Sequence, residues 1–193
     1  MKNILLVTLL LLGGFSLAQA EVKKVFDDSG KLKYERNYEN EKLHGISRGY
    51  YPSGKLKVTS SFYNGLAWGD TIGYYENGKV KASIPFVKGK VEGVQKEFYN
   101  NGQLKSSQRF EKDIPIGTKR VYFPDGNMKA RINFNDKGQM SGTAKEYRKG
   151  GLLKYTIKLE DGKAIKGYLY DKKGNRTEMT SQDFNNMGLQ EKI

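Results

Sequence analysis

The sequence predicts an all-β protein, built as an elongated, meandering antiparallel sheet of stacked β-hairpins. Three observations predict this fold. Glycines recur every 24 residues, aromatic residues occupy fixed positions within that period, and turn-forming dipeptides such as Asn-Gly separate the expected strands. The apolar residues do not recur at the sustained spacing of three to four residues that is typical of an amphipathic helix. A closed barrel or a sandwich is the structural alternative, because a long single sheet exposes a face and two edges.

Glycines open each repeat and set the period. After the first four, an insertion near Lys137 displaces the next two; the series is Gly45, Gly69, Gly93, Gly117, Gly142 and Gly167. Counting back 24 residues from Gly45 gives Glu21, so the repeats begin there and extend to about residue 175. Such self-similarity indicates a repeat architecture in which each unit stacks on its neighbours.

Within each repeat, two turns alternate with two strands. The tenth residue is always glycine, in turns such as Asn77-Gly78, and a second turn such as Asn64-Gly65 follows the second strand. These pairs supply the positive φ angles of tight hairpins. The sixth residue is aromatic, the twelfth is aliphatic or Met, and the eighteenth is aromatic or Leu. Because side chains alternate along a strand, positions 12 and 18 are predicted to face the same side.

The N-terminus has the order of a secretory signal peptide. Lys2 precedes an apolar run, and Ala18-Gln19-Ala20 supplies a small-residue cleavage site. A membrane anchor is the alternative, but the apolar run is short for a span of about 20 residues. We expect removal of residues 1–20 and an exported protein, either periplasmic or secreted to the cell surface or beyond.

The cysteine content and the net charge limit the kinds of site and partner that the chain can have. The 193 residues contain no cysteine, which excludes disulfides and thiolate metal sites, and the formal net charge is +13. Such a charge favours acidic partners. We expect an acidic protein, with anionic lipid or glycan as alternatives; export makes nucleic acid the least favoured acidic partner, and oligomeric state is left open.

The repeat pattern, G-x4-[YF]-[YF]-x2-G-x-L-K with a second aromatic and another N-G turn, resembles the variant MORN repeat of bacterial proteins, including the YwqK-type antitoxin family. Residues 21 to about 175 carry the resemblance, with Gly69 to Gly89 fitting closely. The first unit lacks the opening glycine and the fifth has an insertion. The resemblance implies stacked β-hairpins that form a contact surface for protein or membrane, without catalytic residues. An exported antitoxin would act as an immunity protein against a secreted toxin.

The thirteenth residue of each repeat is lysine, and the seventh is commonly aromatic. Alternation places both on the face opposite the aliphatic position 12. Lysines about 10 Å apart, two strand spacings, would form a basic row. The candidate partner-binding residues are Lys57, Lys81, Lys105, Lys129, Tyr51, Tyr75 and Tyr99. The row either recruits an acidic partner or only keeps the sheet soluble and discourages edge aggregation.

Other features favour binding over catalysis. His44 is the only histidine, and the acidic residues are scattered singly, so we expect no catalytic site, metal site or cofactor. Trp68 is the only tryptophan and serves either as a binding anchor or as packing at a turn. The polar tail, residues 176–193, loses the repeat and either caps the last hairpin or stays mobile.

Overall fold

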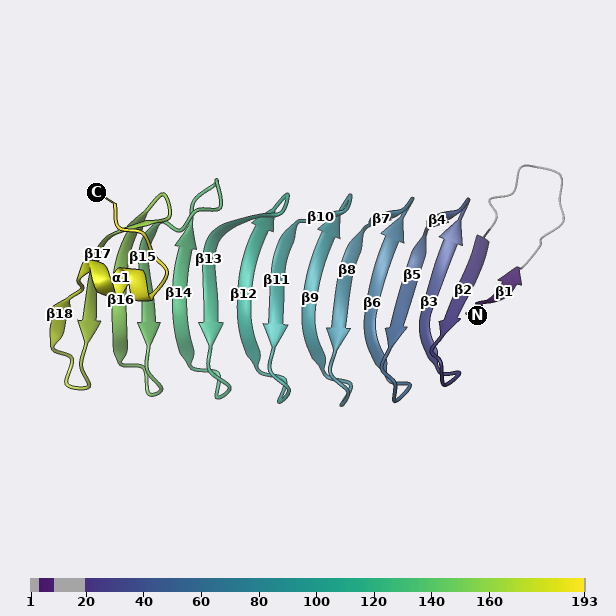
Figure 1. Cartoon of the computed structure of the whole chain (residues 1–193), viewed down its shortest axis with the longest axis horizontal. Coiled ribbons are helices and arrows are strands. Elements are labelled where there is room, and N and C mark those ends of the chain that lie inside the picture. The colour runs from purple at the N-terminus through teal and green to yellow at the C-terminus, as the bar shows by residue number, and fades with distance from the viewer. Residues whose placement is uncertain (1–3, 9–19, 193) are drawn as a thin grey trace. The chain divides into compact units, whose positions relative to one another are not determined.

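This computed structural model describes residues 4–8 and 20–192, and most of the expected signal peptide lies outside them. The chain divides into two compact units, Met1–Val91 (unit 1) and Glu92–Ile193 (unit 2). The boundary falls inside the predicted repeat array. Each unit is an open antiparallel sheet whose strands follow one another in chain order (Figure 1). The all-β hairpin-repeat fold predicted from the sequence is therefore confirmed.

The described residues of unit 1 form ten strands. Its first strand lies within the expected signal peptide and pairs with the second along Glu21–Val25. Short two-residue strands follow the second turn of each repeat. The bounds are β1 Ile4–Thr8, β2 Ala20–Phe26, β3 Leu32–Glu39, β4 Lys42–Leu43, β5 Gly45–Tyr50, β6 Leu56–Tyr63, β7 Leu66–Ala67, β8 Gly69–Tyr74, β9 Val80–Val87 and β10 Lys90–Val91.

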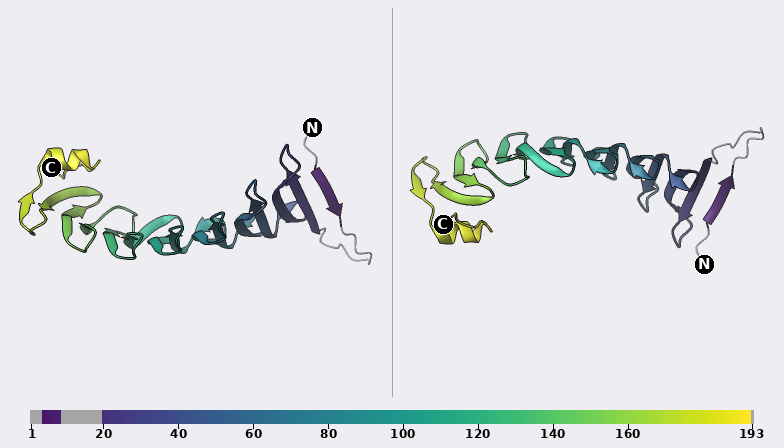
Figure 2. Two further views of the ribbon diagram at one scale, coloured as in Figure 1. Left: turned by 90° about the horizontal axis from the view of Figure 1, so that it is seen from below. Right: turned by 90° about the horizontal axis from the view of Figure 1, so that it is seen from above.

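Unit 2 continues the pattern and ends differently. Its bounds are β11 Gly93–Phe98, β12 Leu104–Glu111, β13 Ile114–Tyr122, β14 Met128–Phe134, β15 Gly142–Tyr147, β16 Leu153–Glu160, β17 Lys163–Tyr170, β18 Arg176–Glu178 and α1 Ser181–Asn186. The tail therefore adds a strand to the sheet edge, and Figure 2 shows α1 lying on one side of that sheet.

Each hairpin that joins positions 6 and 12 contains a β-bulge at the same place. In unit 1, Gly49 pairs with Val58 and Tyr50 pairs with Leu56, so Lys57 has no partner across the hairpin. The same residue of every repeat is skipped: Lys33, Lys57, Lys81, Lys105, Lys129 and Lys154. A bulge sets two residues against one and breaks the alternation of side chains.

The bulge corrects the predicted facing of two positions. Val58 and Phe62 lie on one face, as does Gly49, whose Cβ position would meet Val58 Cγ1 at 2.9 Å. Tyr50 follows Gly49 and pairs with Leu56, so both face the other side. Positions 12 and 18 therefore lie on opposite faces, and the prediction that they share a face was wrong because one extra residue intervenes.

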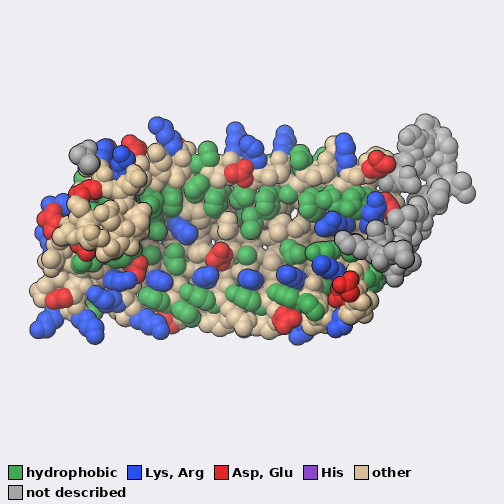
Figure 3. Space-filling view, viewed as in Figure 1, with side chains coloured by type: hydrophobic (Ala, Val, Ile, Leu, Met, Phe, Trp, Pro, Cys, Tyr) green, Lys and Arg blue, Asp and Glu red, His purple; other side chains and the backbone are tan. Residues whose placement is uncertain are grey.

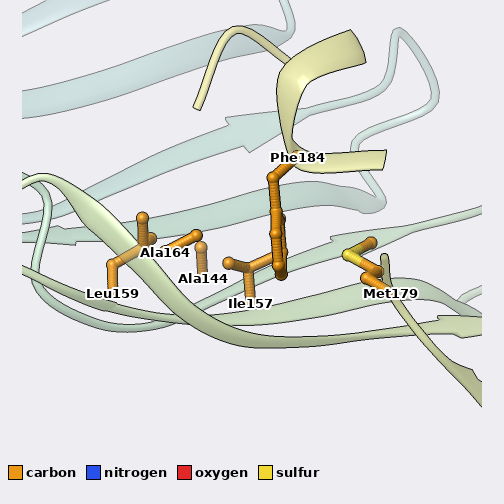
Figure 4. Packing of buried hydrophobic residues seen from close by; sticks show 6 residues of the cluster. All are labelled: Ala144, Ile157, Leu159, Ala164, Met179 and Phe184. Atoms are coloured by element: carbon orange, nitrogen blue, oxygen red, sulfur yellow. The ribbon is translucent and has the colours of Figure 1, made fainter. Parts of the chain in front are cut away.

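The buried core that the structure describes belongs to unit 2. Phe184 of α1 is 2% exposed and packs on Ile157, Leu159 and Ala164 (Figure 4). A capping box begins the helix. The backbone N–H of Asp183 donates to the Thr180 hydroxyl, and the backbone N–H of Thr180 donates to the Asp183 carboxylate. The tail thus supplies the hydrophobic cover that a single-layer sheet lacks.

Candidate functional site

The predicted lysine row lies on the sheet face that α1 covers in unit 2. In the sixth repeat, Lys154 Nζ and the Tyr155 hydroxyl both donate to the Glu146 carboxylate, at 2.8 Å each. Adjacent strand residues would normally face opposite sides, but the bulge at Lys154 brings both to one side. We call the side that carries the lysines, together with Val58 and Phe62 in unit 1 and Ile157 in unit 2, the lysine face.

The predicted tyrosines lie beside these lysines. Lys57 Nζ is 5.6 Å from the ring centroid of Tyr51, and Lys81 Nζ is 5.8 Å from that of Tyr75. Lys129 takes the same place over Phe123, at 5.9 Å. These are cation–π distances, so lysine and aromatic ring share one face as the sequence predicted. Figure 3 shows Lys and Arg side chains interspersed with hydrophobic side chains on the side where α1 lies.

The tyrosine hydroxyls also tie neighbouring repeats together. Tyr51 donates to the carbonyl oxygen of Tyr74 at 2.6 Å, and Tyr99 donates to that of Tyr122 at 2.8 Å. In the last repeat, Arg148 takes over the role and bonds the carbonyl oxygen of Tyr170. Tyr51 and Tyr99 therefore hold the repeats in register, whatever else their rings contact.

The lysine row differs electrostatically between the units. In unit 2, Lys105 pairs with Glu97 at 3.4 Å and Lys154 pairs with Glu146 at 2.8 Å, where glutamate occupies position 5 of the repeat. In unit 1, position 5 is Val25, Gly49 or Gly73, and in the fifth repeat, within unit 2, it is Val121, so that Lys129 forms no described ion pair either. Among the described residues, no carboxylate lies within ion-pair distance of Lys33, Lys57 or Lys81. The unit 1 lysines are therefore available to an outside anion.

Two adjoining hollows mark the lysine face of unit 1. One, of about 380 Å³, is lined by residues that include Lys33, Tyr34, Gly49, Lys57 and Val58. The other, of about 280 Å³, shares Tyr34, Gly49 and Val58. Because Gly49 has no side chain, the space that a larger residue would fill there remains part of both hollows. The two hollows form one depression with aromatic and basic walls.

The second hollow also holds polar groups. Its lining adds Ser47, Arg36 and Phe62. The Ser47 hydroxyl is buried and has no hydrogen-bond partner among the described residues. The Arg36 guanidinium lies 5.0 Å from the Tyr34 ring centroid. A buried hydroxyl without a partner is costly unless water or a ligand satisfies it.

The opposite face of unit 1 carries an exposed aromatic cluster. Tyr63 and Trp68 are 58% and 42% exposed, and their ring centroids are 6.0 Å apart. His44 lies 5.1 Å from Tyr63 and its Nδ1 is 2.8 Å from Glu39. Trp68 is thus partly exposed while it packs edge-on against Tyr63. This cluster is a second contact-prone surface.

Titration in unit 2 follows from the lysine-face ion pair. Burial raises the pKa of Glu146, but hydrogen bonds from Lys154 and Tyr155 lower it more, so the pKa lies below its usual value. Burial, and then the neighbouring carboxylate, raises the pKa of Tyr155. Besides burial, both shifts follow from the contacts that Glu146 makes with Lys154 and Tyr155 across the hairpin.

Residues 4–8 and 20–192 contain no cluster of His, Asp and Glu that could hold a metal ion. Nor does any described helix have the length and apolar character needed to cross a membrane.

Comparison with known families agrees with the repeat geometry. The MORN repeat variant matches five stretches that together exceed half of the chain: residues 22–40, 43–64, 69–88, 91–112 and 115–136. The chain belongs to the MORN repeat variant family. This MORN chain matches no curated protein. The family supports a repeat scaffold for binding, whereas the predicted relationship to YwqK-type antitoxins stays a prediction.

Sequence reasoning found the lysines and tyrosines but missed the depression beside them. When the repeats are aligned with one another, Gly49 of the second repeat corresponds to Glu146 of the sixth, both at position 5. The meaning of this difference depends on knowing that position 5 faces position 14 across the hairpin. The helix could have been found from Thr180-x-x-Asp183 before Phe184, which has the form of a capping box.

Proposed function

We propose that this chain is an exported, non-enzymatic scaffold that binds another protein through the lysine face of unit 1. One observation carries the proposal: in unit 2 the chain's own α1 covers this face with Phe184, while no described helix or loop within residues 20–91 covers it. The uncovered face offers apolar side chains beside lysines without carboxylate partners. Aromatic and basic groups together are typical of protein contact surfaces.

Export follows from the signal-peptide pattern of residues 1–20. Removal of that segment would take β1 away from β2 and leave the chain starting at Glu21. N-terminal sequencing of protein purified from the native host tests this directly. A mature N-terminus at Glu21, in an envelope or culture-fluid fraction, is the expected result; an intact Met1 in the cytoplasmic fraction would contradict export.

Partner binding is tested by capture from the same fractions with three proteins. These are the unaltered chain, a Lys57→Ala/Lys81→Ala variant of the lysine face and a Trp68→Ala variant of the opposite face. We expect one protein to be captured by the first and third and lost with the second. Loss with Trp68→Ala alone would move the interface to the aromatic cluster of Tyr63 and Trp68.

The resemblance to antitoxins gives the scaffold a more specific form. An immunity protein would use the same face to block a secreted toxin, and its partner would be encoded next to it. Co-expression with that neighbouring gene tests this: rescue of growth by the unaltered chain, but not by Lys57→Ala/Lys81→Ala, supports the immunity role. Salt-sensitive binding to anionic vesicles without any protein partner would instead favour attachment to lipid.

A further inference from the structure

Unit 2 contains a carboxylate site whose counterpart in unit 1 has no carboxylate opposite the tyrosine across either strand pair. Lys154 and Tyr155, at positions 13 and 14, hold Glu146 between an ammonium and a hydroxyl group. The Lys154 Nζ also lies 5.7 Å from the Tyr155 ring centroid. Lysine and tyrosine thus form a two-point clamp, with a charge-assisted hydrogen bond from each donor.

Lys33 and Tyr34 repeat this clamp at the same two positions of the first repeat. Lys33 Nζ lies 5.5 Å from the Tyr34 ring centroid, close to the corresponding distance in unit 2. The residue opposite Tyr34 on the preceding strand is Val25, where unit 2 has Glu146. On the other side, Tyr34 pairs with Gly49. Neither neighbour supplies a carboxylate.

The clamp opens into the larger hollow of unit 1. Lys57 lines the same hollow, so two ammonium groups border one depression of about 380 Å³. Asp27 also lines it, but its Oδ1 accepts hydrogen bonds from Ser29 and from the backbone N–H of Lys31, and it forms no described ion pair with either lysine. The volume of the depression exceeds what one carboxylate requires and lies near the lower end for ligand pockets. Val58 and Phe62 extend an apolar wall into the adjoining hollow. The depression therefore suits an acidic side chain together with an apolar neighbour.

We propose that the Lys33–Tyr34 clamp binds a carboxylate side chain of the partner protein, with an adjacent apolar side chain of the same segment seated against Val58 and Phe62. This rests on the proposed function and names the chemistry that the partner must present. Glu146 is the internal copy of the expected contact. An acidic polypeptide segment is favoured over a lipid headgroup because the depression combines a carboxylate clamp with an apolar wall.

The direct test uses two end-capped peptides, one alternating valine with glutamate and the other alternating valine with glutamine. Binding to the isotope-labelled protein is followed by amide chemical shifts. We expect the glutamate peptide to shift the amides of Gly49 and Val58 and to bind at least about tenfold more tightly, since charge-assisted hydrogen bonds distinguish the two. Equal binding of both peptides would overturn the proposal.

Three variants sharpen the result. Lys33→Gln and Tyr34→Phe each remove one donor and should each weaken binding of the glutamate peptide about tenfold. Val25→Glu places a carboxylate where unit 2 has Glu146 and should block the site without unfolding the chain, because unit 2 accommodates that arrangement. Lys105→Gln is the matched control, since Lys105 already pairs with Glu97 in unit 2, and should leave peptide binding unchanged.

The outcomes separate this proposal from the scaffold function itself. A native partner that is captured equally by Val25→Glu and by the unaltered chain would overturn the carboxylate site and leave the scaffold standing. Amide shifts centred on Lys105 and Lys154, and not on Gly49, would also overturn it. Anionic vesicles that bind while the glutamate peptide does not would assign the lysines to a membrane surface and likewise reject the clamp.

Discussion

The hydroxyl of Tyr51 donates a 2.6 Å hydrogen bond to the carbonyl oxygen of Tyr74, one repeat further along the chain. This bond links position 7 of one repeat to position 6 of the next, and Tyr99 and Tyr122 form the same link in unit 2. Repeat arrays gain stability from such contacts between neighbours. Two of the tyrosines that the sequence predicts as contact residues, Tyr51 and Tyr99, therefore stabilise the fold.

Removing the Tyr51 hydroxyl should destabilise unit 1. We expect Tyr51→Phe to lower the free energy of unfolding by about 0.5–1.5 kcal/mol, the usual net contribution of one hydrogen bond. Urea unfolding followed by the fluorescence of Trp68, the only tryptophan in the chain, measures it. Tyr63→Phe is the control, because Tyr63 is 58% exposed. Equal effects of the two changes would contradict a structural role for the Tyr51 hydroxyl.

The seat of α1 depends on glycine at position 167. A Cβ atom there would lie 2.4 Å from Met179 Sδ and 2.8 Å from Phe184 Cε1, so Gly167→Ala should push the tail off the sheet. Overpacking of this kind costs about 1–3 kcal/mol. Gly73→Ala, where nothing lies within 4 Å of the added atom, is the control. Circular dichroism during urea unfolding compares the two; similar losses would argue against a steric seat.

Phe184 should contribute most of the stability of that cover. It is 2% exposed, and Phe184→Ala is expected to lower the free energy of unfolding by about 3–5 kcal/mol through lost burial and a cavity. Hydrogen exchange of the Ile157 amide should accelerate in parallel. Asn185→Ala on the exposed side of the same helix should change neither measurement much. Unchanged exchange at Ile157 in the Phe184 variant would show that the helix is dispensable.

Acid should weaken unit 2 through Glu146. Its pKa is lowered in the folded chain, so the carboxylate contributes stability above its usual value of 4.5, and that contribution is lost as the pH falls through the folded pKa. The stability difference between the unaltered chain and Glu146→Gln should therefore be largest near neutral pH and shrink in acid. Thermal unfolding from about pH 7 to about pH 3 measures it. A difference independent of pH would contradict the ion pair with Lys154.

Much of the fold could be predicted because its signals are local. A turn glycine such as Gly54, with φ of +82°, leaves its mark in the sequence wherever the chain reverses, and the period of 24 residues fixes how hairpins succeed one another. The facing of side chains could not be predicted in the same way. A single bulged residue, Lys57 in the second repeat, reverses the alternation of side chains between the two faces from that point on. Lysine is not a residue type that predicts a bulge.

The sequence by itself determined the repeat, the all-β class and the positions of lysine and tyrosine within each repeat, since these depend on backbone preferences of neighbouring residues. Tertiary structure decided which lysines are neutralised. Lys154 meets Glu146 because strand register sets the two residues near each other across a hairpin, whereas the same register sets Tyr34 against Val25 and Gly49. Strand register brings position 5 opposite position 14 in both units, and the residue at position 5 then decides whether the neighbouring lysine meets a carboxylate.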